Sequence, residues 1–430
     1  MSQNIYLQRY ATPGPRIKKE PVDNLRLVVV IPSYREPHLD LALQSLINCK
    51  QPPCEVEIIV VVNHSENADE ETKTINQQSL ATGKEVTENA PEWLKVHFLQ
   101  VYDMPAKHAG VGLARKIGMD EAVRRFEQLK TGNKSIHKQG VIICFDADCT
   151  CESNYLIAIY NHFIQSNTPA CAIYYEHPIA GEQYSDSVYA GIIQYELYLR
   201  YYVDALRWAG YPFTWQTVGS AIAARSHIYQ KQGGMNLRKA GEDFYFLQKL
   251  FPLPGFSELN TTKVIPSPRV SERVPFGTGK EISQWVNQQK DVLMSYAPES
   301  FKELKQFLNI LPSIYSSNEV GETLKQLPNN IQIYLEARGF APALHKMKNN
   351  AGHYSSFIKQ FYAWFNGLKV LQFFHFTRDE QSQQEVPISE SALWLLNEFN
   401  TSDQTIYDPA ELLKQFRKID NEWNYKVTID

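Results

Sequence analysis

The stretch Val141-Ile-Ile-Cys-Phe-Asp-Ala-Asp148 joins five apolar residues to two aspartates. Its apolar part, mostly β-branched or aromatic, predicts a strand that is covered on both faces of a sheet. A carboxylate cannot continue such a strand without a partner, so we expect Asp146 and Asp148 at its carboxyl end, where open α/β sheets bind ligands. Alternation along the chain points both side chains to one side, and their hard oxygen donors suit Mg²⁺ or Mn²⁺. The alternative is a polar turn that binds nothing.

Further segments extend this pattern on both sides of the aspartates. They are a strand from Leu27 that is broken by Pro32 and followed by a leucine-rich helix, a buried strand from Val56 to Val62, a glycine-bearing turn at 107–112 that leads into a helix ending near Phe126, and a helix that opens at Gly241-Glu-Asp243. Strands that alternate with helices predict an α/β fold with a doubly wound sheet.

Four motifs, in this order and spacing, resemble those of the family 2 glycosyltransferases, which have the GT-A fold with a mixed sheet. The motifs are Ile31-Pro-Ser-Tyr-Arg-Glu36, Gly112-Leu-Ala-Arg-Lys116, Phe145-Asp-Ala-Asp148 and Gly241-Glu-Asp-Phe244. The resemblance implies an inverting glycosyltransferase that moves a sugar from a nucleotide-diphosphate donor to an acceptor hydroxyl. The acceptor, whether saccharide, lipid-linked or a small molecule, stays open.

The implied reaction assigns roles to the acidic residues. Asp148 would contact the Mn²⁺ or Mg²⁺ directly, while Asp146 would contact the ribose or a metal-bound water. Asp243 would be the general base that takes the proton of the acceptor hydroxyl, with Glu242 positioning the acceptor or supporting Asp243. The alternative for Glu242 and Asp243 is a charge pair that interacts favourably with the dipole of the helix.

Nucleotide recognition is assigned by the same resemblance. Pro32, Tyr34 and Glu36 would line the base pocket. Relatives usually have an aspartate-rich turn after the second strand, whereas this chain has Asn63 there, which could hydrogen-bond a base edge. Arg115 would neutralise phosphate or lock the base loop, unless it lies on a solvated helix face.

Two further segments carry candidate ligand contacts. Arg269 and Arg273 precede Phe276-Gly-Thr-Gly-Lys280, and this basic, glycine-bearing stretch predicts either a flexible loop that closes over the diphosphate or an interdomain linker. Trp215 and Gln216 would form the acceptor floor by resemblance, and a core position is the alternative for the tryptophan.

The length of 430 residues predicts more than one domain. We expect an N-terminal leader at 1–24, a GT-A domain at 25–285 and a helical accessory domain at 286–430. A net charge of −4 provides no electrostatic footprint for nucleic acid. No segment reaches about 18 uncharged apolar residues, so no membrane span is expected, and the polar first 24 residues favour a cytoplasmic protein with reduced cysteines.

The stretch 357–376 is the most aromatic part of the chain and predicts a helix with one apolar stripe. We expect this helix to pack in the C-terminal domain, with peripheral membrane contact as the alternative. Two other functions remain open for the whole protein: a nucleotidyltransferase, and a non-catalytic nucleotide-sugar-binding protein on a degenerate transferase scaffold.

Overall fold

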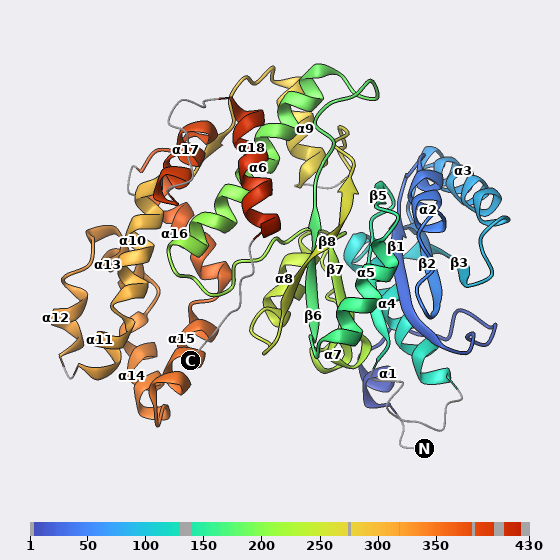
Figure 1. The fold of residues 1–430 in the computed structure, drawn as a ribbon. Helices are drawn as coiled ribbons and strands as arrows, with labels where there is room; N and C mark the ends of the chain where they lie inside the picture. The colour runs from blue at the N-terminus through green and yellow to red at the C-terminus, as the bar shows by residue number, and fades with distance from the viewer. Residues whose placement is uncertain are drawn as a thin grey trace. The chain divides into compact units, whose positions relative to one another are not determined.

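A computed structural model describes residues 4–129, 139–273, 277–317, 319–380, 383–399 and 408–422 (Figure 1). The chain forms two compact units, of which the first comprises residues 1–182 and 217–283 and the second comprises 183–216 and 284–430. These units differ from the expected domains mainly in two places: residues 1–24 belong to the first unit, and one inner segment changes unit. Residues 183–216, which the sequence placed in the α/β domain, pack with the second unit.

The first unit is built on a mixed sheet. Its strands are β1 (Leu25–Ser33), β2 (Glu55–Ser65), β3 (Leu94–Met104), β4 (Val141–Cys144), β5 (Cys149–Cys151), β6 (Ala170–Tyr175), β7 (Ile222–Arg225) and β8 (Ser257–Pro266). Within the described residues their order is β3-β2-β1-β4-β7-β6-β8-β5. The strands β3, β2, β1 and β4 are parallel, whereas β7 is antiparallel to both of its neighbours. The α/β fold class with a mixed sheet is confirmed.

Helices cover the two faces of this sheet. They are α2 (Leu39–Ile47), α3 (Glu70–Thr87), α4 (Val111–Gln128), α5 (Tyr155–Gln165), α7 (Ser226–Lys231) and α8 (Glu242–Leu250). On one face Leu27, Val29 and Ile31 of β1 share a core with apolar residues of α2 and α5. The alternate residues Val28 and Val30 are also buried, and α4 packs against β1 and β2. The apolar run of β1 therefore reflects burial on both faces.

Pro32 does not break the first strand, contrary to the sequence prediction. It pairs in register with Val61 of β2. The carbonyl of Val30 accepts a hydrogen bond from the backbone N–H of Phe145, so Val30 and, by alternation, Pro32 face the β4 side. The β1–β4 ladder has ended there, at Cys144, and the missing N–H of proline therefore costs no hydrogen bond.

The N-terminal segment docks on α4 as an arm that includes α1 (Ile5–Arg9). Asp120 of α4 is buried and accepts hydrogen bonds from the Tyr6 hydroxyl at 2.6 Å and from the Thr12 N–H at 2.7 Å. The neighbouring Glu121 accepts from the N–H groups of Arg16 and Ile17. These contacts explain why α4 buries two carboxylates, since the arm supplies donors to both.

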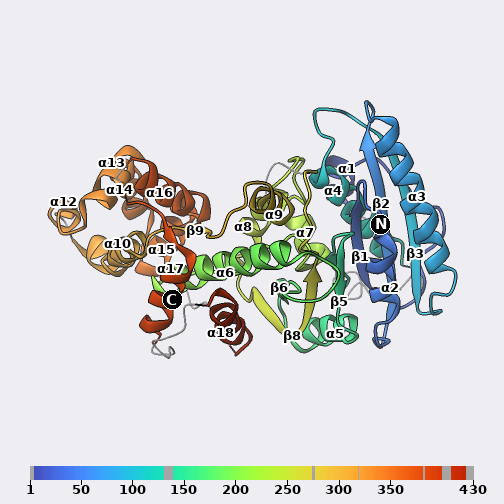
Figure 2. The same ribbon diagram turned by 90° about the horizontal axis from the view of Figure 1, so that it is seen from above.

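The second unit is mainly helical (Figure 2). Its elements are α6 (Asp186–Trp208), β9 (Met294–Ser295), α10 (Pro298–Asn309), α11 (Leu311–Ser316), α12 (Val320–Leu324), α13 (Asn329–Ala337), α14 (Phe340–Asn350), α15 (Tyr354–Trp364), α16 (Gly367–Asp379), β10 (Val386–Pro387), α17 (Ile388–Glu398) and α18 (Pro409–Glu422), while α9 (Thr278–Asn287) crosses the boundary between the units. Buried ion pairs join α6 to α18: Arg200 contacts both Glu196 and Asp420, and Arg417 contacts Glu196.

The aromatic stretch 357–376 forms two helices instead of the single one expected. The Asn366 side chain accepts a hydrogen bond from the Lys369 N–H and so begins α16. Phe357 and Phe361 of α15 are buried, as are Phe373 and Phe374 of α16, which favours the packing interpretation. Across the described ranges, we find no helix that combines the length and the apolar character needed to cross a bilayer.

Candidate functional site

Asp146 and Asp148 lie at the turn that follows β4, as the sequence predicted. The β1–β4 ladder runs to Val30 and Cys144, and the Asp146 carbonyl then accepts a hydrogen bond from the Cys149 N–H. This turn leads into β5, which pairs with β8. Both aspartates are therefore at the carboxyl edge of the parallel strands, where neighbouring loops can reach them.

Arg115 connects these aspartates to the start of α8. Its guanidinium is 2% exposed and donates to Asp146 Oδ1 at 2.9 Å, to Glu242 Oε1 at 3.1 Å and to the Gly219 carbonyl at 2.7 Å. The solvated helix face is thus excluded. Although desolvation lowers the pKa of Arg115, the nearby carboxylates of Asp146 and Glu242 outweigh it and raise that pKa further.

Glu242 and Asp243 form the first turn of α8 and differ in exposure. Glu242 is 2% exposed, and burial raises its pKa to about 7, an effect that Arg115 opposes and the Asp243 charge adds to. Asp243 is half-buried, and its Oδ1 accepts a hydrogen bond from the Phe244 N–H at 2.7 Å. Desolvation also raises the pKa of Asp243. The more exposed carboxylate is thus the one assigned as base.

Gly112 allows the loop before α8 to pack directly on α4. A Cβ at this position would lie 2.1 Å from the Arg238 carbonyl oxygen, which is a severe clash with backbone. The Asn236 side chain in the same loop donates to the Glu242 carbonyl at 2.9 Å. This explains physically why the motif that carries Arg115 begins with glycine. The sequence did not indicate that Asn236 contacts the site.

Arg269 and Arg273 reach the same edge and bind two carboxylates together. Asp148 Oδ2 accepts from Arg269 Nη2 at 2.9 Å and from Arg273 Nη2 at 3.2 Å. Glu36 Oε2 accepts from Arg273 Nη1 at 3.0 Å and also contacts Arg269 Nη2. Both arginines therefore lie at the aspartate edge. Phe276, in the expected loop, lies outside the described residues.

The residues assigned to the base pocket have different environments. Pro32 is buried in β1, whereas Tyr34 is exposed and its carbonyl accepts from Arg273 Nη1 at 2.9 Å. Asn63 donates both hydrogens of its amide to backbone carbonyls, those of Ser33 and Val61. Only its oxygen could then contact a base.

Asn76 of α3 is a site residue that the sequence did not indicate. Its side chain donates to the Asn63 carbonyl and accepts from the Arg35 N–H. Arg35 has a positive φ of 49°, an uncommon conformation for a residue with a side chain. This network therefore holds the turn that carries Glu36. A polar residue inside an amphipathic helix carries no signal for such a contact.

The aspartates fit a divalent cation. Their side chains are 33% and 28% exposed, and each uses one oxygen for arginine. The second oxygen of each remains available as a hard ligand. Among the described residues, no group of three or more histidine, cysteine, aspartate or glutamate side chains could hold a metal. The remaining ligands would therefore come from a diphosphate and water, as is usual for Mg²⁺.

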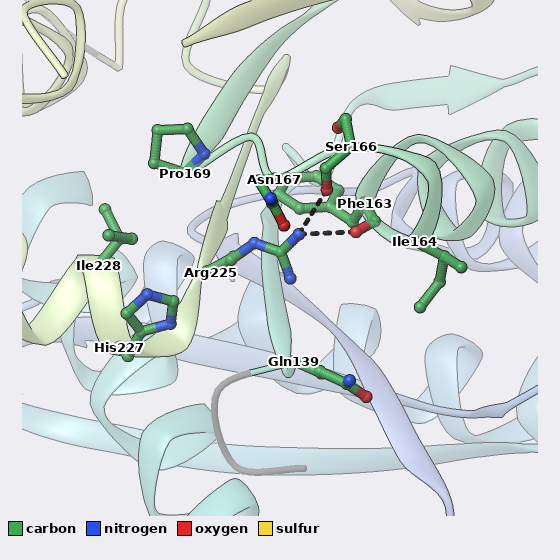
Figure 3. Close-up of a pocket in the computed structure, with 9 residues that line it drawn as sticks. All are labelled: Gln139, Phe163, Ile164, Ser166, Asn167, Pro169, Arg225, His227 and Ile228. Atoms are coloured by element: carbon green, nitrogen blue, oxygen red, sulfur yellow. Dashed lines mark hydrogen bonds between the residues drawn. The ribbon is translucent and has the colours of Figure 1, made fainter. Parts of the chain in front are cut away.

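A polar pocket lies elsewhere on the first unit (Figure 3). Arg225 lines it, and its guanidinium is held by the carbonyl oxygens of Phe163 and Ser166. Because Arg225 pairs with Val141 at the start of β4, this pocket is at the amino end of that strand. It is thus separate from the aspartate edge.

Trp215, the expected acceptor-floor residue, belongs to the second unit and is buried, which favours its core interpretation.

Comparison with known proteins adds little to this geometry. The chain matches no protein-family model and no curated protein. Among solved structures it is similar to S. aureus TarS 1–349 in complex with UDP-GlcNAc, with 14% identity, a TM-score of 0.40 and coverage of 83% of this chain and 92% of that one. The same fragment with UDP gives 12% identity, a TM-score of 0.36 and coverage of 88% and 92%. Similarity at this level carries no argument about activity.

Proposed function

We propose that this protein is an inverting glycosyltransferase of the family 2 type that uses a nucleotide-diphosphate sugar and a divalent metal. One observation carries the proposal: Arg115 bonds at once to Asp146 of the aspartate turn and to Glu242 beside Asp243. The aspartate pair, which would bind the metal, and the half-buried Asp243 thus lie at one sheet edge. Departure of a diphosphate and deprotonation of a hydroxyl need these two groups close together.

The diphosphate end of the donor would lie at Asp148 and the two arginines. When bound, Mn²⁺ or Mg²⁺ supplies positive charge that stabilises the departing diphosphate. Asp146 and Asp148 would hold that cation through their second oxygens. Arg269 and Arg273 would donate hydrogen bonds to phosphate oxygens, since a guanidinium fork suits this geometry.

Asp243 would take the proton of the acceptor's hydroxyl group. The oxygen of that hydroxyl would attack the anomeric carbon from the face opposite the diphosphate. This single displacement inverts the anomeric centre. Glu242 supports the step by electrostatics. Because burial raises its pKa to about 7, part of the Glu242 population carries a proton at neutral pH. Protonated Glu242 removes a like charge beside Asp243, and Arg115 offsets part of the remaining negative charge of Asp146 and Asp243.

Donor hydrolysis with a panel of UDP-, GDP- and dTDP-sugars and Mn²⁺ tests this proposal. We expect slow release of free sugar and nucleoside diphosphate. In Asp243→Asn the rate of this release should fall by about two to four orders of magnitude. Asp186→Asn is the matched control, because Asp186 is also an acid in the first turn of a helix. Pyrophosphate formation from a nucleoside triphosphate and a sugar phosphate would instead indicate a nucleotidyltransferase. If the protein binds nucleotide but shows neither of these activities, it is a non-catalytic binding protein.

A further inference from the structure

Four charged side chains form a compact group at the aspartate edge, which we call the arginine–carboxylate cluster: Glu36, Asp148, Arg269 and Arg273. Each arginine contacts both carboxylates, and all four contacts converge on Glu36 Oε2 and Asp148 Oδ2. Two positive and two negative charges leave the cluster neutral. A neutral, internally paired cluster presents no free charge to a single ligand.

The two carboxylates of this cluster are not equivalent. Glu36 is 1% exposed, its Oε1 accepts from the His38 N–H at 3.1 Å, and its own carbonyl accepts from the Ser79 hydroxyl. Asp148 is 28% exposed, and its Oδ1 lies 4.0 Å from the Cys149 thiol. Glu36 is therefore fixed on both oxygens and in its backbone, whereas Asp148 can change partners.

We propose that Glu36 is a positioning residue that keeps Arg269 and Arg273 at the site while they exchange Asp148 for the donor diphosphate. This inference rests on the proposed function and deepens it. Its consequence is coupling between the two ligands. A cation approaching Asp148 alone meets two arginines, and a diphosphate alone meets Asp146 and Asp148. When both are bound, Asp148 would hold the cation and the arginines would donate to the phosphates, so that each of these charges would have a partner.

The same contacts make a base-pocket role for Glu36 unfavourable. A carboxylate whose two oxygens both accept hydrogen bonds from the protein has little capacity left for a nucleobase. Burial of such a carboxylate is tolerated because two guanidinium groups neutralise it. Glu36 thus acts through the arginines, and Tyr34 is an exposed side chain of this turn.

Calorimetric titration of the full chain tests the exchange. The probes are Mn²⁺ alone, UDP or GDP alone, and each in the presence of the other. For the wild type we expect Mn²⁺ to bind roughly 5- to 150-fold more tightly when nucleotide is present, and nucleotide to gain the same factor from Mn²⁺, because coupling is reciprocal. In Arg273→Gln, Mn²⁺ alone should bind several-fold more tightly, nucleotide with Mn²⁺ should bind at least about tenfold more weakly, and the coupling factor should fall.

Glu36→Gln should change the affinity for Mn²⁺ alone in the direction opposite to Arg273→Gln. Without their buried anchor the arginines depend on Asp148 alone, so Mn²⁺ alone should bind more weakly than to the wild type, and nucleotide with Mn²⁺ should also bind more weakly. Arg269→Gln is a second, independent test of the arginine arm. Arg378→Gln is the matched control, since Arg378 is an ion-paired arginine of the second unit. Circular dichroism and thermal melting confirm that each variant is folded.

The titrations distinguish failure of the exchange from failure of the proposed function. If the wild type binds nucleotide but Mn²⁺ and nucleotide bind independently, or if Mn²⁺ alone binds Arg273→Gln and Arg269→Gln no better than the wild type, the exchange is wrong and the proposed function survives. If the wild type binds no nucleoside diphosphate with or without Mn²⁺, the proposed function fails and the exchange fails with it.

Discussion

Glu242→Gln should change the pH dependence of stability in a defined direction. Glu242 is buried and its pKa is raised from 4.5 to about 7, mainly by desolvation. The folded protein therefore holds this proton more tightly than the unfolded chain does. The stabilising contribution is complete below the unfolded pKa of 4.5, and it is lost as the pH rises through about 7.

The magnitude follows from the two pKa values. Between pH 5 and pH 8 the wild type should lose about 2–3 kcal/mol of unfolding free energy through this group. Glutamine keeps an acceptor oxygen for the Nε of Arg115 but cannot ionise. The variant should therefore gain about 2–3 kcal/mol relative to the wild type over this range. The charge of Asp243 acts on Glu242, so the titration belongs to the pair.

Urea unfolding at pH 5, 6, 7 and 8 measures this difference. Glu70→Gln is the control, because its side chain is 87% exposed and it should follow the wild type at every pH. A stability difference between Glu242→Gln and the wild type that stays constant from pH 5 to pH 8 would refute the argument. It would mean that Glu242 titrates normally in the folded protein.

Other substitutions test the site and the second unit. Asp148→Asn should abolish Mn²⁺-dependent nucleotide binding in calorimetry without altering the melting temperature, and unchanged affinity would remove Asp148 from the metal role. Gly219→Ala would place a Cβ 2.8 Å from Asp243 Oδ2 and 3.0 Å from Arg115 Nη2; we expect at least a tenfold loss of turnover with the fold retained, on the order expected for a small misplacement of reacting groups, and full turnover would show that Asp243 tolerates displacement. Asp420→Ala removes the buried partner of Arg200 and Arg207 and should cost about 3 kcal/mol in urea unfolding; a loss below about 1 kcal/mol would show that other carboxylates replace it.

The sequence determined the parts of the site that depend on neighbours in the chain. The apolar run before Asp146 predicted a buried strand, and the desolvation cost of a carboxylate predicted that Asp146 and Asp148 follow its end. The same local logic applies at the start of α18, where the Asp408 side chain accepts a hydrogen bond from the Ala410 N–H and Pro409 takes the first helical position. These features need no information about distant residues.

Only the tertiary structure decided which charges are paired. Arg115 could have been solvated on its helix, and it is buried because Asp146 and Glu242, from two other parts of the chain, converge on it. Resemblance assigned Glu36 to the base pocket, and only the structure shows that this buried carboxylate contacts Arg269, 233 residues away. Pairing of charges depends on distances between segments, and neither hydrophobic period nor turn chemistry encodes those distances. For the same reason the sequence assigned residues 183–216 to the α/β domain, whereas the ion pairs of α6 with α18 hold them in the second unit.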